Sequence, residues 1–501
     1  MNTTSTAGKR DWIALGVLSS IALLLSVDVS VLYLALPHLS SELGASAPQQ
    51  LWIMDIYSFM LAGFLVTMGT LGDRIGRRRL LLAGSAAFGL VSVAAAFSSS
   101  AEMLVVTRAL LGIAGATLMP SSMALIRNIF RDPKQMGAAI GIWFSCFMVG
   151  MAAGPLVGGL LLQHFWWGSA FLLGVPFMVV VLVAGPLVLP EYRDGTAGRL
   201  DLASVALSLG AILPAIYGLK EITRSGWQPA AVLAVAAGAA MGVLFVRRQR
   251  RLADPLLDLR LFGDRAFAAS LTILMLGGVV MAGITLTVTT FLQSVAGLSP
   301  LAAGLWMIPP SLVMIVALSA GPMLARRVQP AYVMAGGLAL GAAGMALMTF
   351  ADASGGVAVL VVGLVLAQAG IALPMGLGNG IMMAAAPPEK AGSAASISET
   401  SGEFGVAVGV AALGSLAAAV FRAGLPAGVD ADTLAGAVAE TLGDPALLAG
   451  ARAAYTSGLH AVAGVGAAVF LGLAVLTVAV LRARPDRQER QATPEPALTW
   501  S

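Results

Sequence analysis

The sequence predicts an all-α integral membrane protein with fourteen transmembrane helices. Hydrophobic residues make up 58% of the 501 residues and charged residues only 11%, and the mean hydropathy is +0.89. Such a chain is far more apolar than a soluble globular protein. Apolar segments of roughly 20 residues, the length that crosses a bilayer as a helix, follow one another along it. The expected helices are 12–36, 51–72, 80–99, 102–125, 137–162, 166–189, 201–220, 228–246, 267–293, 301–324, 331–350, 356–383, 394–420 and 458–481.

Basic residues indicate how these helices are oriented. Counted from the N-terminus, arginine and lysine gather in alternate loops, and only Lys220, Arg224, Arg422 and Arg452 fall in the others. Because basic residues concentrate in cytoplasmic loops, both termini are predicted in the cytoplasm. The same distribution explains the net charge of +4 better than a nucleic-acid partner does. The excess of arginine over lysine is typical of a GC-rich bacterial genome, so the expected location is the bacterial inner (cytoplasmic) membrane.

A short internal repeat divides the chain into two halves. Residues 69–84 align without gaps on residues 321–336, with Gly69 matching Gly321 and Arg74 matching Arg326. Two pseudo-symmetric six-helix bundles with two inserted helices between them account for this spacing. The predicted units are 1–190, the first bundle; 191–265, the inserted helices and a linker; 266–483, the second bundle with a loop at 422–457; and 484–501, a disordered cytoplasmic tail.

Four acidic side chains fall inside the apolar segments, namely Asp28, Asp55, Glu399 and Glu403. A carboxylate in hydrocarbon costs on the order of 3 kcal/mol, so each is expected to line a pathway for a proton or a cation. At about 1.5 Å per residue, Asp28, Asp55 and Arg108 lie at similar depths, and they are expected to form one cluster in which Arg108 pairs with Asp28. A permanent structural ion pair is the alternative.

Glu399 and Glu403 lie four residues apart and therefore share a helix face. Two carboxylates that close do not both ionise in a dry site, so one of them is expected to hold a proton. This is what a proton carrier requires. For Glu403 the alternative is a structural hydrogen bond to backbone left open beside Gly402 and Gly405.

Four motifs stand in order in the first half: Val27–Pro37, Gly69–Arg78, Leu104–Gly115 and Gly150–Gly159. Together they resemble the signatures of the major facilitator superfamily, in its fourteen-helix drug:proton antiporter branch. The likeness covers nearly the whole chain. It implies proton-coupled export of lipophilic, mainly cationic drugs, dyes and antiseptics by alternating access, with a cavity between the two halves.

The resemblance also implies roles for single residues. Protons and cations would exchange at Asp28, Asp55, Glu399 and Glu403, with Arg108 tuning Asp28. Tyr33 departs from the family pattern, in which asparagine is common, and its ring could stack on a flat cation. Asp73, Arg74 and Arg77 would latch the inner gate. Gly154 and Pro155 would shape a seal, since small residues permit close helix packing and proline permits a kink.

Other classes of protein are disfavoured. The chain has no G-x-x-x-x-G-K-[ST] phosphate loop, and one cysteine with three histidines gives neither a disulfide framework nor a metal site. No catalytic set can be assembled, so an enzyme is not expected. The expected protein is a monomer without a cofactor that contacts small cationic or amphiphilic substrates, protons and lipids. A dedicated exporter of one native metabolite, lipid or peptide, and a membrane scaffold or sensor that transports nothing, stay open as alternatives.

Overall fold

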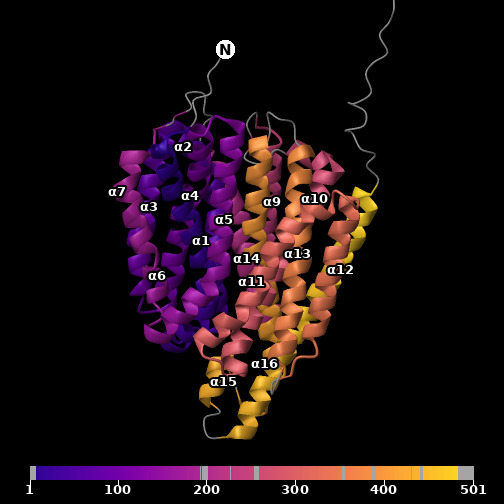
Figure 1. The fold of residues 1–501 in the computed structure, drawn as a ribbon. Helices are drawn as coiled ribbons and strands as arrows, with labels where there is room; N and C mark the ends of the chain where they lie inside the picture. The colour runs from indigo at the N-terminus through magenta and orange to yellow at the C-terminus, as the bar shows by residue number, and fades with distance from the viewer. Residues whose placement is uncertain are drawn as a thin grey trace, which may run out of the picture.

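The computed structural model describes residues 7–191, 193, 201–225, 227–252, 255, 259–352, 356–385, 391–429, 431–440 and 444–482. These residues form a bundle of long helices (Figure 1), and no strand occurs among them. The all-α prediction is confirmed. The predicted tail at 484–501 lies outside the described residues.

The helices follow the order expected from the apolar segments. The first half holds α1 (Lys9–Leu43), α2 (Ala47–Ile75), α3 (Arg77–Ala96), α4 (Ala101–Ile129), α5 (Pro133–His164), α6 (Ser169–Leu172) and α7 (Gly174–Val188). Then come α8 (Leu202–Ser225), α9 (Pro229–Gln249) and the 3-10 turn η1 (Leu259–Gly263). The second half holds α10 (Arg265–Thr290) with its π-helical extension η2 (Phe291–Val295), α11 (Pro300–Leu324), α12 (Pro330–Met348), α13 (Val357–Ala385), α14 (Ala391–Ala423), α15 (Leu434–Glu440) and α16 (Pro445–Leu481).

Each of the fourteen expected segments overlaps one of these helices. By length and composition, 12 helices of the described chain are able to cross a membrane, and α2, which bends by 49°, makes 13. The exception is α8, which is apolar over the shorter stretch Leu202–Gly218. Figure 1 shows the start of α1 and the end of α16 at the same end of the bundle, opposite α15. An even number of crossings satisfies this arrangement, and the count of fourteen remains a prediction.

Helix packing in the second half repeats that of the first. In the first half α1 packs against α5 and α7, α4 against α2 and α3, and α3 against α7. In the second half α10 packs against α14 and α16, α13 against α11 and α12, and α12 against α16. The two patterns coincide when α10 to α14 correspond to α1 to α5 and α16 corresponds to α7. The aligned residues 69–84 and 321–336 indicate the same correspondence.

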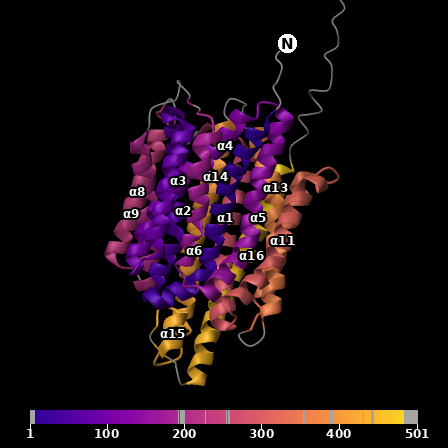
Figure 2. The ribbon, with the colours of Figure 1, turned by 60° about the vertical axis from the view of Figure 1, so that its left-hand side comes forward.

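The halves meet along two helix pairs that are themselves equivalent, α2 with α14 and α5 with α11. The inserted helix α8 packs against α9 and also against α2 and α14. Figure 2 shows α8 and α9 together at one edge of the bundle. The insertion therefore covers one side of the seam between the halves.

We call the end of the bundle that carries α15 the α15 end, and the opposite end, where α1 begins, the arginine-rich end. At the α15 end the Gln293 side-chain amide donates to the Leu34 carbonyl over 3.0 Å, joining η2 to α1. A Cβ atom on Gly304 of α11 would collide with the Pro155 carbonyl of α5, and one on Gly159 would lie 2.6 Å from the Pro300 carbonyl. The two halves are thus in backbone contact at this end.

Candidate functional site

An arginine and an aspartate form an ion pair inside the first half. Arg108 of α4 lies with its Nη1 3.3 Å from Asp28 Oδ2 on α1, and the residues are 2% and 7% exposed. Arg108 Nε donates to the Ile53 carbonyl over 3.2 Å. The guanidinium carbon lies 4.5 Å from the centroid of the Tyr57 ring. The expected pair is therefore present, and α2 supplies two further partners for the arginine.

Two glycines of the fourth-helix motif make room for this arrangement. Gly112 and Gly115 follow Arg108 by four and seven residues and so lie on the same face of α4. A Cβ atom on Gly112 would collide with the Tyr57 carbonyl, and one on Gly115 would lie 3.0 Å from the Tyr57 hydroxyl. The missing side chains let α4 approach α2 closely and place Arg108 over the ring.

Glu403 brings the second half to the same place. It lies on α14, which packs against α2, and its carboxylate is close enough to the Ser58 side chain of α2 to interact with it. The next residue, Phe404, contacts Phe59 with ring centroids 6.4 Å apart. Tyr57 is close enough to interact electrostatically with Asp28, Arg108 and Glu403. Acids of both halves therefore face one site.

Tyr33 of α1 also belongs to this site. It is buried and lies within electrostatic range of both Glu403 and Arg108. We call Asp28, Tyr33, Tyr57, Arg108 and Glu403 the central cluster. Glu399 lies one turn from Glu403, interacts with it, and like it is half-buried, so both acids border space that is not completely filled.

The structure does not turn Asp55 toward Arg108, contrary to the single cluster expected from depth. At about 100° per residue, Asp55 points roughly 160° away from Ile53 and Tyr57, the two residues of α2 that hold Arg108. It shares a face with Trp52 and Phe59, which pack with residues of α8 and α14. Asp55 is completely buried, and it lies on the side of α2 that meets the insertion.

At the arginine-rich end, Asp73 pairs with Arg77 rather than with Arg74. Arg77 donates to Asp73 Oδ1 through Nε over 2.7 Å and lies 2.6 Å from it through Nη2. Arg77 is 8% exposed, whereas Arg74 is exposed. Of the three residues expected at the inner gate, the structure pairs Asp73 with Arg77 and leaves Arg74 at the surface.

Sequence reasoning missed Glu191, which binds the next two arginines. Its carboxylate lies 3.6 Å from Arg78 and 3.6 Å from Arg79, and Arg78 also donates to the Leu189 carbonyl over 3.1 Å. These contacts join the end of α7 to the start of α3. An acid at the end of one apolar segment and an arginine run in another loop were the available signals, and neither identifies the other as its partner.

Gly154 and Pro155 face two different helices. A Cβ atom on Gly154 would collide with Ser30 Oγ, which makes Gly154 a close contact between α5 and α1. The Pro155 carbonyl meets Gly304 of α11, across the seam. The motif thus lets α5 pack closely against α1 of its own half and against α11 of the other half.

Across the described part of the chain, no three or more His, Cys, Asp and Glu residues gather as a metal site would require. The central cluster contains two acids, one arginine and two phenols, which are side chains able to exchange protons and to attract an organic cation.

Known proteins similar to this chain are membrane transporters. The family profile described as Major Facilitator Superfamily matches residues 18–410. The multidrug efflux pump LfrA of Mycolicibacterium smegmatis is 41% identical, over 96% of this chain and 98% of that protein. The methyl viologen resistance protein SmvA of Salmonella typhimurium is 37% identical, over 88% and 89%. The tetracenomycin C resistance and export protein of Streptomyces glaucescens is 31% identical, over 98% and 95%.

Solved structures show the same architecture. One is a bacterial homologue of the human lysosomal transporter Spinster, crystallised in an inward-facing, unoccupied conformation. It superposes with a TM-score of 0.70 and covers 96% of this chain and 100% of that chain. The sequences are 17% identical, so the likeness concerns the fold alone.

Proposed function

The chain belongs to the major facilitator superfamily, and from that premise we propose that it exports lipophilic, mainly cationic drugs, dyes and antiseptics in exchange for protons. Membership makes it a multi-span membrane transporter rather than an enzyme. The relatives named for multidrug efflux and methyl viologen resistance support the substrate class, since methyl viologen is an organic dication.

The observation that carries the proposal is the meeting of acids from both halves in the central cluster. Asp28 lies on the first half, and Glu403 of the second half lies close enough to Ser58 of the first to interact with it. A cation that enters between α2 and α14 would compete with Arg108 for Asp28 and replace the proton shared by Glu399 and Glu403. Separation of the two helices would break the contact between Ser58 and Glu403, so that protonation and opening are coupled.

The surroundings of Arg108 favour an ion pair that changes partner over a static one. Removing one member of a buried pair usually costs about 3–5 kcal/mol, because the other charge is left without compensation. Arg108 also holds the Ile53 carbonyl and the Tyr57 ring. Since these partners stay with Arg108 when Asp28 takes a proton or a cation, the penalty for releasing Asp28 is smaller.

The arginine-rich end is the cytoplasmic side in this proposal, with both termini there and the chain in the bacterial inner membrane. Contacts between the halves at the α15 end, such as Gln293 with Leu34, support a state that is closed toward the outside. Asp73 with Arg77 would then control the cytoplasmic opening, and Gly154 with Pro155 the outer seal. The protein would work as a monomer in contact with lipid, with domain limits near residues 190 and 265.

Dye efflux in inverted vesicles with an imposed pH gradient tests the proposal. We expect collapse of the gradient, Asp28→Asn, Glu399→Gln and Glu403→Gln each to reduce efflux at least about tenfold, the effect of losing a proton-transfer group. Glu102→Gln, an exposed acid at the start of α4, is the matched control and should behave as wild type. Efflux that is indifferent to the gradient and to all three substitutions would end the proposal.

A second candidate is a dedicated exporter of one native metabolite. The relative named for tetracenomycin C export favours it. A deletion strain separates the two: hypersensitivity to a panel of toxic cations supports multidrug export, and unchanged sensitivity supports a single native substrate.

A further inference from the structure

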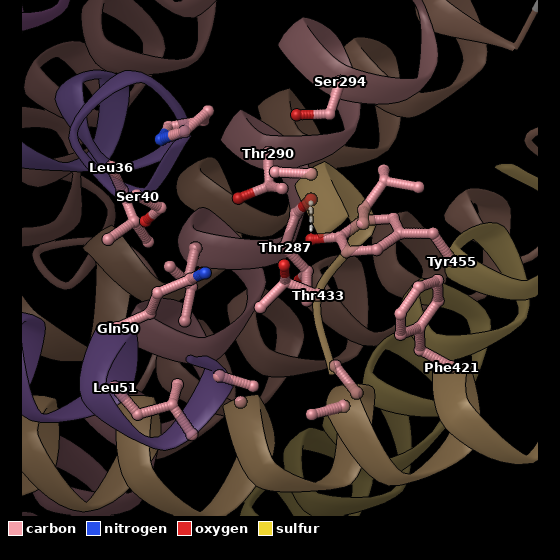
Figure 3. Close-up of a pocket in the computed structure, with 18 of the residues that line it drawn as sticks. Leu36, Ser40, Gln50, Leu51, Thr287, Thr290, Ser294, Phe421, Thr433 and Tyr455 are labelled. Carbon is pink, nitrogen blue, oxygen red and sulfur yellow. Dashed lines mark hydrogen bonds between the residues drawn. The ribbon is translucent and has the colours of Figure 1, made fainter. Parts of the chain in front are cut away.

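A pocket lies between the two halves at the α15 end (Figure 3). The space between its atoms amounts to about 700 Å³, a figure that includes open solvent. Its walls come from α1 and α2 of the first half, from α10, η2, α14 and α16 of the second, and from α15 with the residues before it. Because both halves contribute, the pocket changes shape whenever they move relative to each other.

The lining is rich in hydroxyl and amide groups. Figure 3 shows Ser40, Gln50, Thr290 and Tyr455 around the cavity, with Thr433 and Ser294 beside them. The Tyr455 hydroxyl donates to the Thr287 carbonyl over 3.4 Å. In contrast, Ser40 Oγ is buried without a hydrogen-bond partner, and Ser40 is 4% exposed. Ser40 is one of the residues around the pocket, and a ligand polar group that reached its unpaired hydroxyl would gain a hydrogen bond.

The pocket differs in charge from the central cluster. Its one acidic lining residue, Asp432, lies 3.5 Å from Arg422, so the two charges largely offset each other. The remaining polar groups are neutral and both donate and accept hydrogen bonds. Leu36, Leu51 and Phe421 supply apolar surface. Such a lining suits uncharged, oxygen-bearing polycyclic groups rather than a bare cation.

Pocket and cluster lie in sequence along the same helices. On α1, Tyr33 belongs to the cluster, Leu34 accepts the bond from Gln293, and Ser40 lines the pocket. Seven residues separate Tyr33 from Ser40, which is roughly 10 Å along a helix. The bond that joins the halves therefore lies between the two sites.

We propose that this pocket is a second substrate subsite, which binds the hydroxyl- and carbonyl-bearing part of an amphiphilic drug after it has passed the central cluster. The inference rests on the proposed export function and adds a substrate class to it. Cations without hydrogen-bonding groups, such as tetraphenylphosphonium, need only the central cluster. Hydroxylated polycyclic amines, such as doxorubicin, use both sites.

Thiol labelling tests binding separately from transport. Cys146 is the single cysteine, so Gln50→Cys in a Cys146→Ser background places one reporter at the half-buried edge of the pocket. We expect doxorubicin to slow its modification by a membrane-impermeant maleimide several-fold, and tetraphenylphosphonium to leave the rate unchanged. The same protection should persist with Asp28→Asn, which stops transport in the proposed function. Equal rates with and without doxorubicin, or equal protection by both compounds, would refute the subsite.

Transport kinetics supply the second measurement. Ser40→Ala should raise the KM for doxorubicin about fivefold, the usual effect of one hydrogen bond, with the KM for tetraphenylphosphonium unchanged. Ser41→Ala is the matched control, because this neighbouring hydroxyl is exposed and bonds to the His38 carbonyl. A Ser40→Ala variant in which both KM values change together, or neither changes, contradicts the inference.

Discussion

Arg108 lies over the ring of Tyr57, with its guanidinium carbon 4.5 Å from the ring centroid. Tyr57 is followed by Ser58, which interacts with Glu403 of the other half. Two consecutive residues of α2 therefore contact the arginine of the first half and an acid of the second. Movement of α2 relative to α14 is transmitted to both.

The ring of Tyr57, rather than its hydroxyl, is expected to hold Arg108. A desolvated cation–π contact contributes about 2 kcal/mol, which corresponds to roughly 30-fold in an equilibrium constant. Tyr57→Phe keeps the ring and should retain most dye efflux, whereas Tyr57→Leu should lose at least about tenfold. Rates of efflux at equal protein abundance check this. Equal activity of the two variants would show that the ring is not needed.

Gly112 is expected to tolerate no side chain. Its Cβ atom would meet the backbone carbonyl of Tyr57, which cannot move aside as a flexible side chain can. Gly112→Ala should lower stability by about 1–3 kcal/mol, as overpacking does, and displace Arg108. Gly464→Ala is the control, since a Cβ atom there meets nothing within 4 Å. Thermal unfolding in detergent should show a lower midpoint for the first variant and an unchanged or higher one for the second.

The sequence predicts how deep a residue lies along its helix better than it predicts which way the side chain points. The lengths of the apolar segments were sufficient to predict the helices. The depth of each residue along its helix was sufficient to predict that Asp28 lies beside Arg108. Depth does not specify the direction in which a side chain points, and Asp55 was placed with Arg108 for that reason although it faces α8 and α14.

The meeting of Glu403 with Ser58 was not predictable from either helix. Ser58 and Glu403 are 345 residues apart in the sequence and belong to different repeats, and a local pattern does not encode which helices form the seam between the repeats. The pairing of Asp73 with Arg77 was within reach, because residues four apart share a helix face whereas adjacent residues such as Asp73 and Arg74 do not.

Arg77, not Arg74, should matter for transport. Arg77 is 8% exposed and bound to Asp73, so Asp73→Asn leaves a buried guanidinium without its counter-charge. We expect Asp73→Asn and Arg77→Gln each to reduce efflux several-fold, and Arg74→Gln, at an exposed position, to have little effect. Parallel efflux assays at matched expression decide it. The reverse order would return the gating role to Arg74.

Asp201 at the start of α8 should make stability depend on pH. Hydrogen bonds from the Arg248 side chain, at 2.7 Å and 3.2 Å, are the main cause that lowers the pKa of Asp201 below its ordinary value of 3.8. A group whose folded pKa is depressed contributes stability above its unfolded pKa, and that contribution is lost as pH falls through the folded pKa. The contact is therefore intact at pH 6, and its contribution to stability begins to fall below about pH 4, the ordinary pKa of an aspartate.

Arg248→Gln measures this contribution. Its unfolding midpoint should lie below that of the wild type at pH 6, and the difference should shrink as pH falls below about 4, because Asp201 then takes up a proton first in the unfolded chain and at lower pH in the folded one. Arg250→Gln, an exposed neighbour, should match the wild type at pH 6 and at pH 3. A difference between Arg248→Gln and the wild type that is the same at pH 6 and pH 3 would assign it to packing instead of charge.

Gln293 is expected to keep the closed α15 end releasable. Its Nε2 donates to the Leu34 carbonyl, but its Oε1 is buried without a hydrogen-bond partner. The bond contributes about 1 kcal/mol, whereas the buried oxygen costs about 1–3 kcal/mol, so closure with glutamine is close to neutral or unfavourable. Opening returns both groups to water. A methionine of similar shape has no such oxygen and gains about 1.5–3 kcal/mol by staying buried.

Gln293→Met should therefore hold the α15 end closed. With Ser40→Cys in the Cys146→Ser background as a buried reporter, modification from the outside should slow at least about tenfold, the factor that corresponds to 1.4 kcal/mol, and dye efflux should fall with it. Thr289→Val is the matched control, because that buried hydroxyl bonds only within its own helix, to the Thr285 and Leu286 carbonyls. The opposite outcome is faster labelling of Gln293→Met than of the control. It would mean that the bond to Leu34 stabilises the closed end by more than the buried oxygen destabilises it. The contact would then not be releasable.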